Sequence, residues 1–227
     1  MALFALEKNL RKSILETGDK VSLDLYVKFK SAQRWFVYQQ YARIFGLCRF
    51  LNVNNLYDIG CGFECQAFLL ANHSHMTYVG IDCGNKIDFN HINELFANYN
   101  GKIKFQKRKY PFTIMPAKNN IAIACGWLGK YDETKKKITS SLSIDFERIF
   151  INLLGDESFE TCYEVWAAEL SDFKLHKIGY NRFIFGTKHP EEIFMLKTVE
   201  YNFLDDRFAI ENVDSCEFVD MMQHFGK

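Results

Sequence analysis

The chain has 227 residues, 48% of them hydrophobic, and equal numbers of basic and acidic residues give it a formal net charge of zero. This length suits one domain with a sizeable core, and the apolar content excludes a disordered chain. Because Glu7 and Lys8 interrupt the apolar start, we expect neither a signal peptide nor a membrane span. Seven cysteines without a C-x-x-C pair predict reduced thiols and a cytoplasmic location.

Two helices are predicted in the first 53 residues, which we interpret as an N-terminal helical cap (residues 1–53). The spacing of apolar residues predicts an amphipathic helix from Leu3 to Glu16, which the following Thr-Gly-Asp sequence would end. A second helix, rich in aromatic residues, is predicted from about Ser31, a suitable N-cap, to Phe50.

The most informative stretch consists of two apolar runs, each with an acidic residue at or near its end. Residues 56–62 read LYDIGCG, and a helical pattern follows over 63–71. The second run, 78–81, stops at Asp82. This pattern predicts a strand, a glycine turn, a helix and a second strand. Gly60 and Gly62 would let a ligand lie against the backbone, and a carboxylate at the tip of the second strand can accept hydrogen bonds from ribose hydroxyls.

Residues 58–62, DIGCG, resemble the first motif of the class I S-adenosylmethionine-dependent methyltransferases, and residues 78–82, YVGID, resemble their second. The resemblance implies a doubly wound fold that binds S-adenosylmethionine. The cofactor-binding residues that it implies are Asp58, Gly60, Cys61, Gly62, Asp82, Cys83, Gly126 and Trp127. A dinucleotide site of the NAD type also pairs glycines with an acid, so it remains an alternative.

The sequence departs from this family pattern at two places. Glu64 stands where the family usually has a third glycine. Lys107, Arg108, Lys109 and Tyr110 follow the third predicted strand, where the family often offers an acid or amide to adenine. Backbone contacts or stacking on Tyr110 would replace that group.

The rest of the chain predicts an α/β fold with a doubly wound, mostly parallel seven-stranded sheet whose last strand is antiparallel. Its core would span residues 54–189. The segment 190–227 is too apolar for a free tail, so we expect it to pack on the core or to form a dimer contact. Further strands are predicted at 102–106, 120–125, 147–154, 173–178 and 182–187, helices at 85–98 and 158–170, and a helix or surface loop at 132–141.

Catalytic candidates are titratable groups near strand ends, where the ligand cleft of such a sheet lies. A hydroxyl acceptor needs a base, and Asp156 and His189 are the candidates, with Glu157 and His176 as further ones. No metal site is expected, because the soft donors at 61, 65, 73 and 75 overlap the glycine turn that would hold the cofactor. The loop after the fourth predicted strand has no proline, which excludes the enzymes that methylate base amines of DNA through an Asn/Asp-Pro-Pro-aromatic motif.

Charge is distributed unevenly along the chain. Residues 101–137 hold ten Lys/Arg against two acids, whereas residues 191–227 hold nine acids against three bases. Zero net charge favours a small-molecule acceptor, such as an oxygen nucleophile on a sugar or on a phosphate-bearing metabolite, and the basic segment would attract an anionic one. Two alternatives stay open: an RNA methyltransferase, and a non-catalytic subunit that binds the cofactor or a partner. A membrane partner is not expected, and a homodimer stays open.

Overall fold

The computed structural model describes most of the central part of the chain. The described residues are Lys12, Glu16, 35–62, 76–84, 89–97, 102–114, 119–125, 133–152, 159–178 and 183–201.

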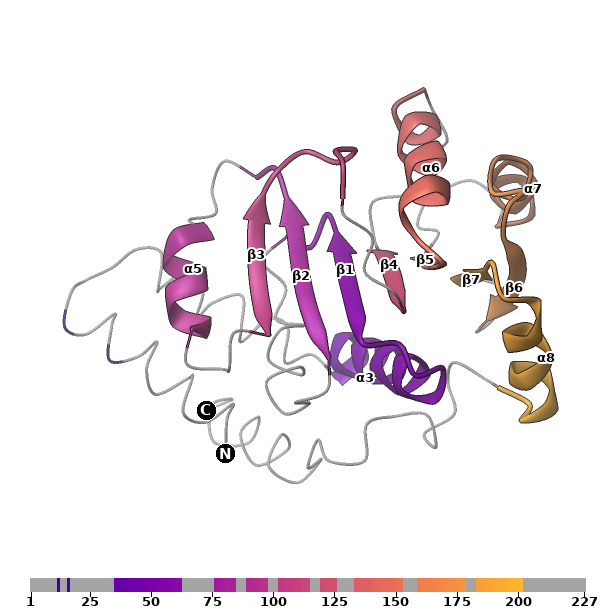
Figure 1. Cartoon of the computed structure of the whole chain (residues 1–227), viewed down its shortest axis with the longest axis horizontal. Coiled ribbons are helices and arrows are strands. Elements are labelled where there is room, and N and C mark those ends of the chain that lie inside the picture. The colour runs from indigo at the N-terminus through magenta and orange to yellow at the C-terminus, as the bar shows by residue number, and fades with distance from the viewer. Residues whose placement is uncertain are drawn as a thin grey trace.

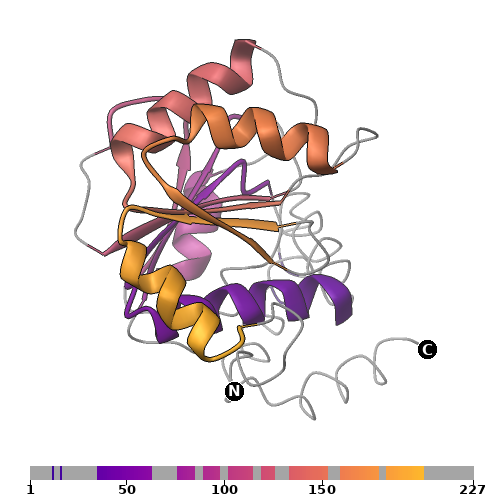
Figure 2. The same cartoon turned by 90° about the vertical axis from the view of Figure 1, so that its right-hand side faces the viewer.

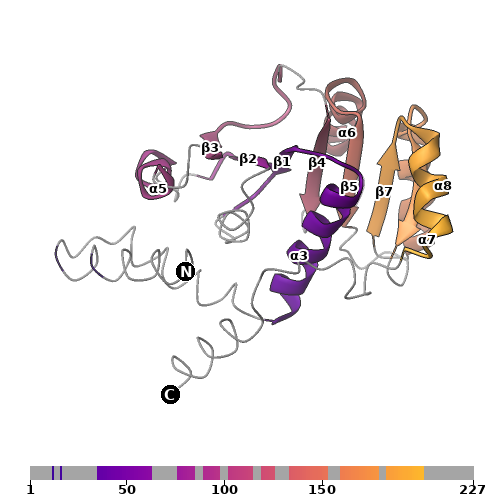
Figure 3. The ribbon, with the colours of Figure 1, turned by 60° about the horizontal axis from the view of Figure 1, so that its bottom comes forward.

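A seven-stranded sheet forms the centre of the molecule, with the strands in the order β3-β2-β1-β4-β5-β7-β6 (Figures 1 and 3). Neighbouring strands are parallel except around β7, which runs antiparallel to both β5 and β6. The predicted fold class is therefore confirmed. The strands are β1 (Asn55–Ile59), β2 (Thr77–Asp82), β3 (Ile103–Lys107), β4 (Asn120–Cys125), β5 (Arg148–Asn152), β6 (Lys174–Ile178) and β7 (Phe183–Thr187).

Helices cover both faces of the sheet, with α6 and α7 on one side and α3 and α8 on the other (Figure 2). This arrangement explains the sequence of β4, in which residues 121–124 are all buried and apolar, because a parallel strand between two helical layers has no solvated face. The described helices are α3 (Trp35–Phe50), α5 (Phe89–Phe96), α6 (Glu133–Asp145), α7 (Phe159–Glu169) and α8 (Pro190–Thr198).

One described core cluster lies between the sheet and helices α6 and α7. Alternate strand residues point into it, such as Ile149 and Ile151 of β5, because side chains of a strand alternate between faces. Leu142 of α6 and Trp166 of α7 contribute to this core from the helical layer, and both are fully buried. This packing fixes α6 over the central strands, close to the carboxyl ends of β1 and β2.

Strand β3 is an edge strand, and α5 covers its free backbone groups. Asn93 of α5 donates a hydrogen bond to the carbonyl of Phe105 at 2.9 Å and accepts one from its N–H at 2.7 Å. One side chain thus pairs the donor and the acceptor that β2 leaves unused, which protects this part of the edge against pairing with another chain.

Several predicted boundaries differ from the observed ones by one to four residues at helix and strand ends. The stretch at 132–141, left as a helix or loop, is a helix that continues to Asp145. The predicted helix at 63–71 lies outside the described residues. So does the helix predicted at 3–16, apart from Lys12 and Glu16, whose side chains form an ion pair at 3.7 Å.

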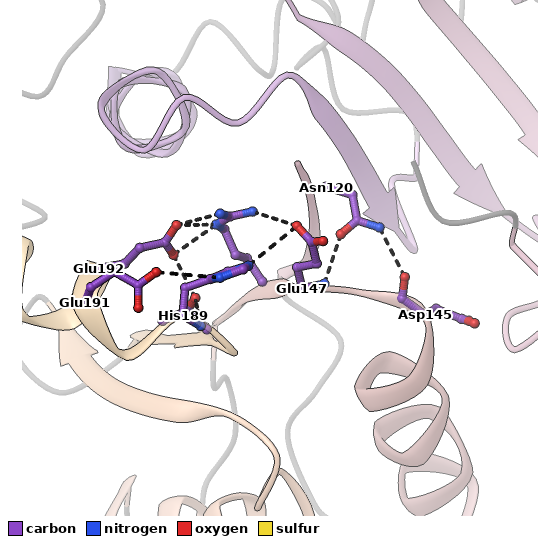
Figure 4. A network of polar contacts seen from close by, with 8 residues as sticks. Asn120, Asp145, Glu147, His189, Glu191 and Glu192 are labelled. Atoms are coloured by element: carbon purple, nitrogen blue, oxygen red, sulfur yellow. Dashed lines mark hydrogen bonds and ion pairs between the residues drawn. The ribbon is translucent and has the colours of Figure 1, made fainter. Parts of the chain in front are cut away.

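Helix α8, beyond the predicted core, is tied to β5 by a buried ion pair. The guanidinium of Arg148 donates to both carboxylate oxygens of Glu192, at 2.8 and 2.9 Å from Nε, and the Thr187 hydroxyl donates to the same carboxylate at 2.7 Å (Figure 4). Ile193 and Leu196 are also buried. The start of the C-terminal segment therefore packs on the sheet, and residues 202–227 lie outside the described part.

No helix in the described ranges combines the length and the apolar character that crossing a membrane requires.

Candidate functional site

The chain makes a tight turn immediately after β1, at the carboxyl end of the parallel strands. Gly60 and Gly62 both have positive φ, at 73° and 55°, a conformation that favours glycine. The N–H groups of Gly60 and Cys61 donate to the carbonyl of Ile81, at 2.8 and 3.2 Å. The turn is thereby folded onto the end of β2, next to Asp82.

The carboxylate of Asp82 joins this turn to the loop after β2. Oδ2 accepts a hydrogen bond from the N–H of Gly62 and Oδ1 accepts one from the N–H of Gly84, both at 2.7 Å. The carboxylate is therefore held in place before any ligand arrives. Each of its oxygens can accept a further hydrogen bond, because a carboxylate offers about four acceptor positions.

Asp58 lies on β1, two residues before Gly60. It is only 2% exposed, and its Oδ2 accepts a hydrogen bond from the Tyr78 hydroxyl at 2.8 Å. Cys61 is buried as well, and its thiol donates to the carbonyl of Gly62 at 3.4 Å. Both side chains are buried, and neither lines the adjoining pocket.

A pocket of about 310 Å³ opens where β1, β2 and β3 end. This volume is at the lower end of the range for small-ligand sites in proteins. Asp82 supplies a carboxylate, and Arg108 and Lys109 supply positive charge. The remaining walls are mostly apolar. The residues that line the pocket are Ile59, Gly60, Ile81, Asp82, Cys83, Arg108, Lys109, Tyr110 and Ile138.

Tyr110 is a fixed part of the pocket wall. Its hydroxyl donates to Oδ2 of Asp145 at 2.9 Å, and the residue is 6% exposed. Burial and the neighbouring Asp145 raise the pKa of Tyr110, so the ring stays neutral. Burial also raises the pKa of Asp145, although the hydrogen bond from Tyr110 opposes that shift. The pair holds an aromatic ring between the pocket and α6.

Arg108 belongs to both β3 and the pocket. Its backbone N–H donates to the carbonyl of Asp82 at 2.9 Å, which continues the β2–β3 ladder by one residue. The guanidinium lies over the ring of Phe112, with Cζ 4.7 Å from the ring centre. Its position at the pocket is thus set by backbone pairing and by a cation–π contact.

The structure brings only part of the predicted cofactor set to the pocket. Gly60, Asp82 and Cys83 line it, Gly62 binds the Asp82 carboxylate, and Asp58 and Cys61 are buried outside its lining. Gly126 and Trp127 lie outside the described residues, as does the catalytic candidate Asp156.

The prediction that His189 is catalytic requires a correction, because this residue lies at the opposite end of the parallel strands from the pocket. It follows β7, whose end Thr187 pairs with Arg148 at the start of β5, whereas the pocket lies where β1 and β2 end. Three strand spacings and the length of β5 separate the two places, about 14 Å across and about 13 Å along the sheet. His189 instead lies between Glu147 and Glu191, 3.7 Å from a carboxylate oxygen of each (Figure 4). It does not reach the pocket in the role that we predicted.

His176, the further candidate, is on β6, at the end of the sheet far from β1. Desolvation and the positive charge of Lys197 lower its pKa. Its surroundings are those of an edge strand covered by α8, and this position does not support a role at the pocket.

Sequence reasoning did not single out Ile138 as a pocket residue. It comes from α6, more than fifty residues beyond Asp82, and only the packing of α6 over the sheet brings it there. In the sequence, Ile138 is an apolar residue in a helical pattern, and this signal does not distinguish a pocket residue from any other core residue. In contrast, Arg108 and Lys109 were noted in the sequence because they stand where the family has an adenine-binding acid.

Among the described residues, no three His, Cys, Asp or Glu side chains gather where they could hold a metal ion. Three of the soft donors noted in the sequence, Cys65, His73 and His75, fall outside those residues. That transfer needs no metal stays a prediction.

The sequence matches no protein-family model and no curated protein. Its structure, however, resembles solved structures. One is the magnesium protoporphyrin IX methyltransferase ChlM from Synechocystis PCC 6803 with bound S-adenosylmethionine, at a TM-score of 0.52 and 15% identity, over 81% of this chain and 97% of that one. The fold is that of class I S-adenosylmethionine-dependent methyltransferases.

The same methyltransferase fold is found in the methyltransferase domain of the bacterial protein CtHen1-CN, at a TM-score of 0.53 and 12% identity, over 66% of this chain and 97% of that domain. The S-adenosylmethionine-dependent methyltransferase SibL in its apo form matches at a TM-score of 0.44 and 12% identity, over 62% of this chain. The chain spans about half of the length of SibL, 52%. At these identities the comparisons with ChlM and CtHen1-CN show the fold alone.

Proposed function

We propose that the chain binds S-adenosylmethionine in the pocket beside Asp82 and transfers the methyl group to an acceptor. The observation that carries this proposal is the Asp82 carboxylate, held by the N–H groups of Gly62 and Gly84 at the wall of the pocket. A carboxylate fixed in this way is ready to accept the two hydroxyls of a ribose without losing further freedom. The fold shared with ChlM supports the same ligand.

The other pocket residues fit a nucleoside. Ile81, Ile138 and the fixed ring of Tyr110 offer an apolar slot for a flat base. Gly60 and Gly62 leave the turn without side chains, so the methionine part can approach the backbone closely. No acid follows β3, so we assign recognition of adenine to backbone groups and to packing on Tyr110.

When bound, S-adenosylmethionine supplies a reactive methyl group on a sulfonium, so the task of the protein is to hold the acceptor in line with it. The turn at 60–62 and Asp82 fix one end of that alignment. Arg108 and Lys109 place positive charge at the pocket, which favours an anionic acceptor.

Calorimetry with S-adenosylhomocysteine, the demethylated product, tests this proposal on the full chain, with NAD⁺ as the competing ligand for a glycine turn followed by an acid. The proposal expects saturable binding of S-adenosylhomocysteine and none of NAD⁺ at the same concentrations. Binding of NAD⁺ alone would contradict it.

Binding without any transfer from labelled S-adenosylmethionine to a metabolite pool or to RNA would leave the non-catalytic alternative. The transfer assay should be run with and without a chelator, because we expect no metal dependence.

A further inference from the structure

The exposed face of edge strand β3 carries a row of basic side chains that ends at the pocket. Side chains of a strand alternate between its two faces, and the ladder to β2 continues as far as Arg108. One face therefore presents Lys102, Lys104, Gln106 and Arg108 in sequence. The other face presents Ile103 and Phe105, which are buried. We call the row Lys102, Lys104 and Arg108 the basic row.

The basic row is accessible and its charges are not neutralised by described carboxylates. Lys104 and Arg108 are exposed, and Lys102 is half-buried. Within the described part of the chain, no Asp or Glu forms an ion pair with any of the three. Lys107 and Lys109, both exposed, add two further charges at the same end of the strand. Positive charge thus continues from the outer end of β3 to the pocket.

The length of the row selects a polymer as its partner. Six residue-to-residue steps of extended chain lead from Lys102 to Arg108, which corresponds to about 20 Å. The pocket, at about 310 Å³, accommodates one nucleoside-sized ligand. A small anionic metabolite that reaches the pocket contacts Arg108 and Lys109 and leaves the outer lysines without a partner. A chain of phosphates contacts all of them.

An aromatic side chain beside the row favours nucleic acid over other polyanions. The half-buried ring of Phe112 lies against the guanidinium of Arg108 at the pocket end. Proteins that bind single strands combine a basic track along the backbone with aromatic or Arg surfaces on which bases stack. An acidic peptide has no bases that would use this ring.

An anionic membrane surface fits less well. Membrane-binding surfaces combine basic groups with apolar side chains that enter the lipid. Among the described residues, the large exposed apolar side chains are Ile144, Val165, Phe194 and Met195, on α6, α7 and α8. None of them belongs to β3 or to the segment that follows it.

We propose that the basic row binds a single-stranded nucleic acid and leads it to the rim of the pocket, beside the bound cofactor. Binding to the row is independent of the proposed methyl transfer, whereas the assignment of this strand as the methyl acceptor rests on that proposed function. This assignment favours a nucleic-acid acceptor over the small-molecule acceptor that the zero net charge suggested. Among the described acids, Glu191 and Glu192 lie on α8, which packs on β6 and β7 at the other end of the sheet.

The test is fluorescence anisotropy with labelled 12-nucleotide oligouridylate and oligothymidylate, in the absence of cofactor. The variant Lys102→Gln, Lys104→Gln, Arg108→Gln removes the row. The control Arg49→Gln, Lys174→Gln, Lys197→Gln removes the same three charges from exposed positions on α3, β6 and α8. We expect the row variant to bind on the order of 10- to 100-fold more weakly than the control. Its salt dependence should be flatter by about 2 in log–log slope, at about 0.7 per phosphate contact.

Equal binding by the two variants would overturn the proposal, as would no binding of either oligonucleotide by the wild-type chain at low salt. Anionic vesicles that displace the oligonucleotide and bind more tightly through the same three residues would replace nucleic acid by a membrane. Calorimetry with S-adenosylhomocysteine on the single variant Lys104→Gln, which lies away from the pocket, reports separately on the cofactor site and on folding. Cofactor binding retained in Lys104→Gln, together with weakened oligonucleotide binding in the row variant, is the expected pattern.

Discussion

The Asp82 carboxylate accepts a hydrogen bond from the N–H of Gly62, twenty residues earlier in the chain, at 2.7 Å. This contact links the two motifs that the sequence shows as separate patterns. The same carboxylate binds the N–H of Gly84, so the turn after β1 and the loop after β2 form one unit around it. A ligand that binds Asp82 therefore meets a site whose two loops are already fixed.

Gly80 is required by packing behind this site. A Cβ at this position would lie 2.6 Å from Cδ1 of Phe105 and 3.0 Å from the Cys61 sulfur, and the Phe105 ring is itself buried. Gly80→Ala should lower the free energy of unfolding by about 1–3 kcal/mol, the usual cost of overpacking. Urea unfolding measures this loss. The double variant Gly80→Ala, Phe105→Leu should recover part of it, and an unchanged midpoint in the single variant would refute the packing argument.

The sequence predicted the fold class well because the signals are local and repeated. The runs at 56–59, 78–81 and 120–125 are apolar strands between turn signals, and the glycine turn with Asp82 places the first two side by side. The position of the pocket followed from the rule that ligands bind at the carboxyl ends of parallel strands.

The predicted role of His189 conflicted with the antiparallel last strand that the sequence itself predicts. A strand that runs antiparallel carries the residues after it to the opposite end of the sheet, and this end is held by the Arg148–Glu192 pair, whose partners are 44 residues apart. The contribution of Ile138 to the pocket, in contrast, was hidden in the sequence, because it depends on where α6 packs. Single-residue roles of this kind come from tertiary contacts, which one sequence does not display.

The Arg148–Glu192 pair should be important for stability. Both side chains are buried, and removing Glu192 leaves the Arg148 guanidinium with only the part-exposed carboxylate of Glu147, 3.2 Å from Nη1. Glu192→Ala should cost about 3–5 kcal/mol in unfolding free energy. Glu191→Ala, a neighbour on the same helix whose side chain is 69% exposed, is the control and should stay within about 1 kcal/mol. Equal midpoints for the two variants in urea would show that the buried pair contributes nothing.

His176 should make stability depend on pH. Desolvation lowers its pKa in the folded state, so the unfolded chain binds the proton more readily. This group therefore contributes stability above its ordinary pKa of about 6.5, and the contribution is lost as the pH falls below that value. The melting temperature should fall between pH 7.5 and 5.5. His176→Gln should reduce that decrease, and a variant with the same pH profile as the wild type would exclude His176 as its source.

Cys83 offers a chemical probe of the pocket. It is exposed and lines the pocket, whereas Cys48 and Cys61 are buried. Burial raises the pKa of the Cys48 thiol to about 12, which suppresses its reactive thiolate. N-ethylmaleimide should therefore modify Cys83 before Cys48 and Cys61, as peptide mass spectrometry can show. Saturating S-adenosylhomocysteine should slow that modification at least about tenfold, while methionine alone should not. An unprotected Cys83 would place the ligand elsewhere.

The affinity of the Asp82→Ala variant for S-adenosylhomocysteine, measured by calorimetry, tests the central claim most directly. Loss of charge-assisted hydrogen bonds to the ribose should cost about 1.5–3 kcal/mol, or roughly 10- to 150-fold in Kd. Glu94→Ala, at an exposed position on α5, removes the same charge away from the pocket and should bind as the wild type does. A wild-type Kd in Asp82→Ala, with the fold intact, would contradict the account.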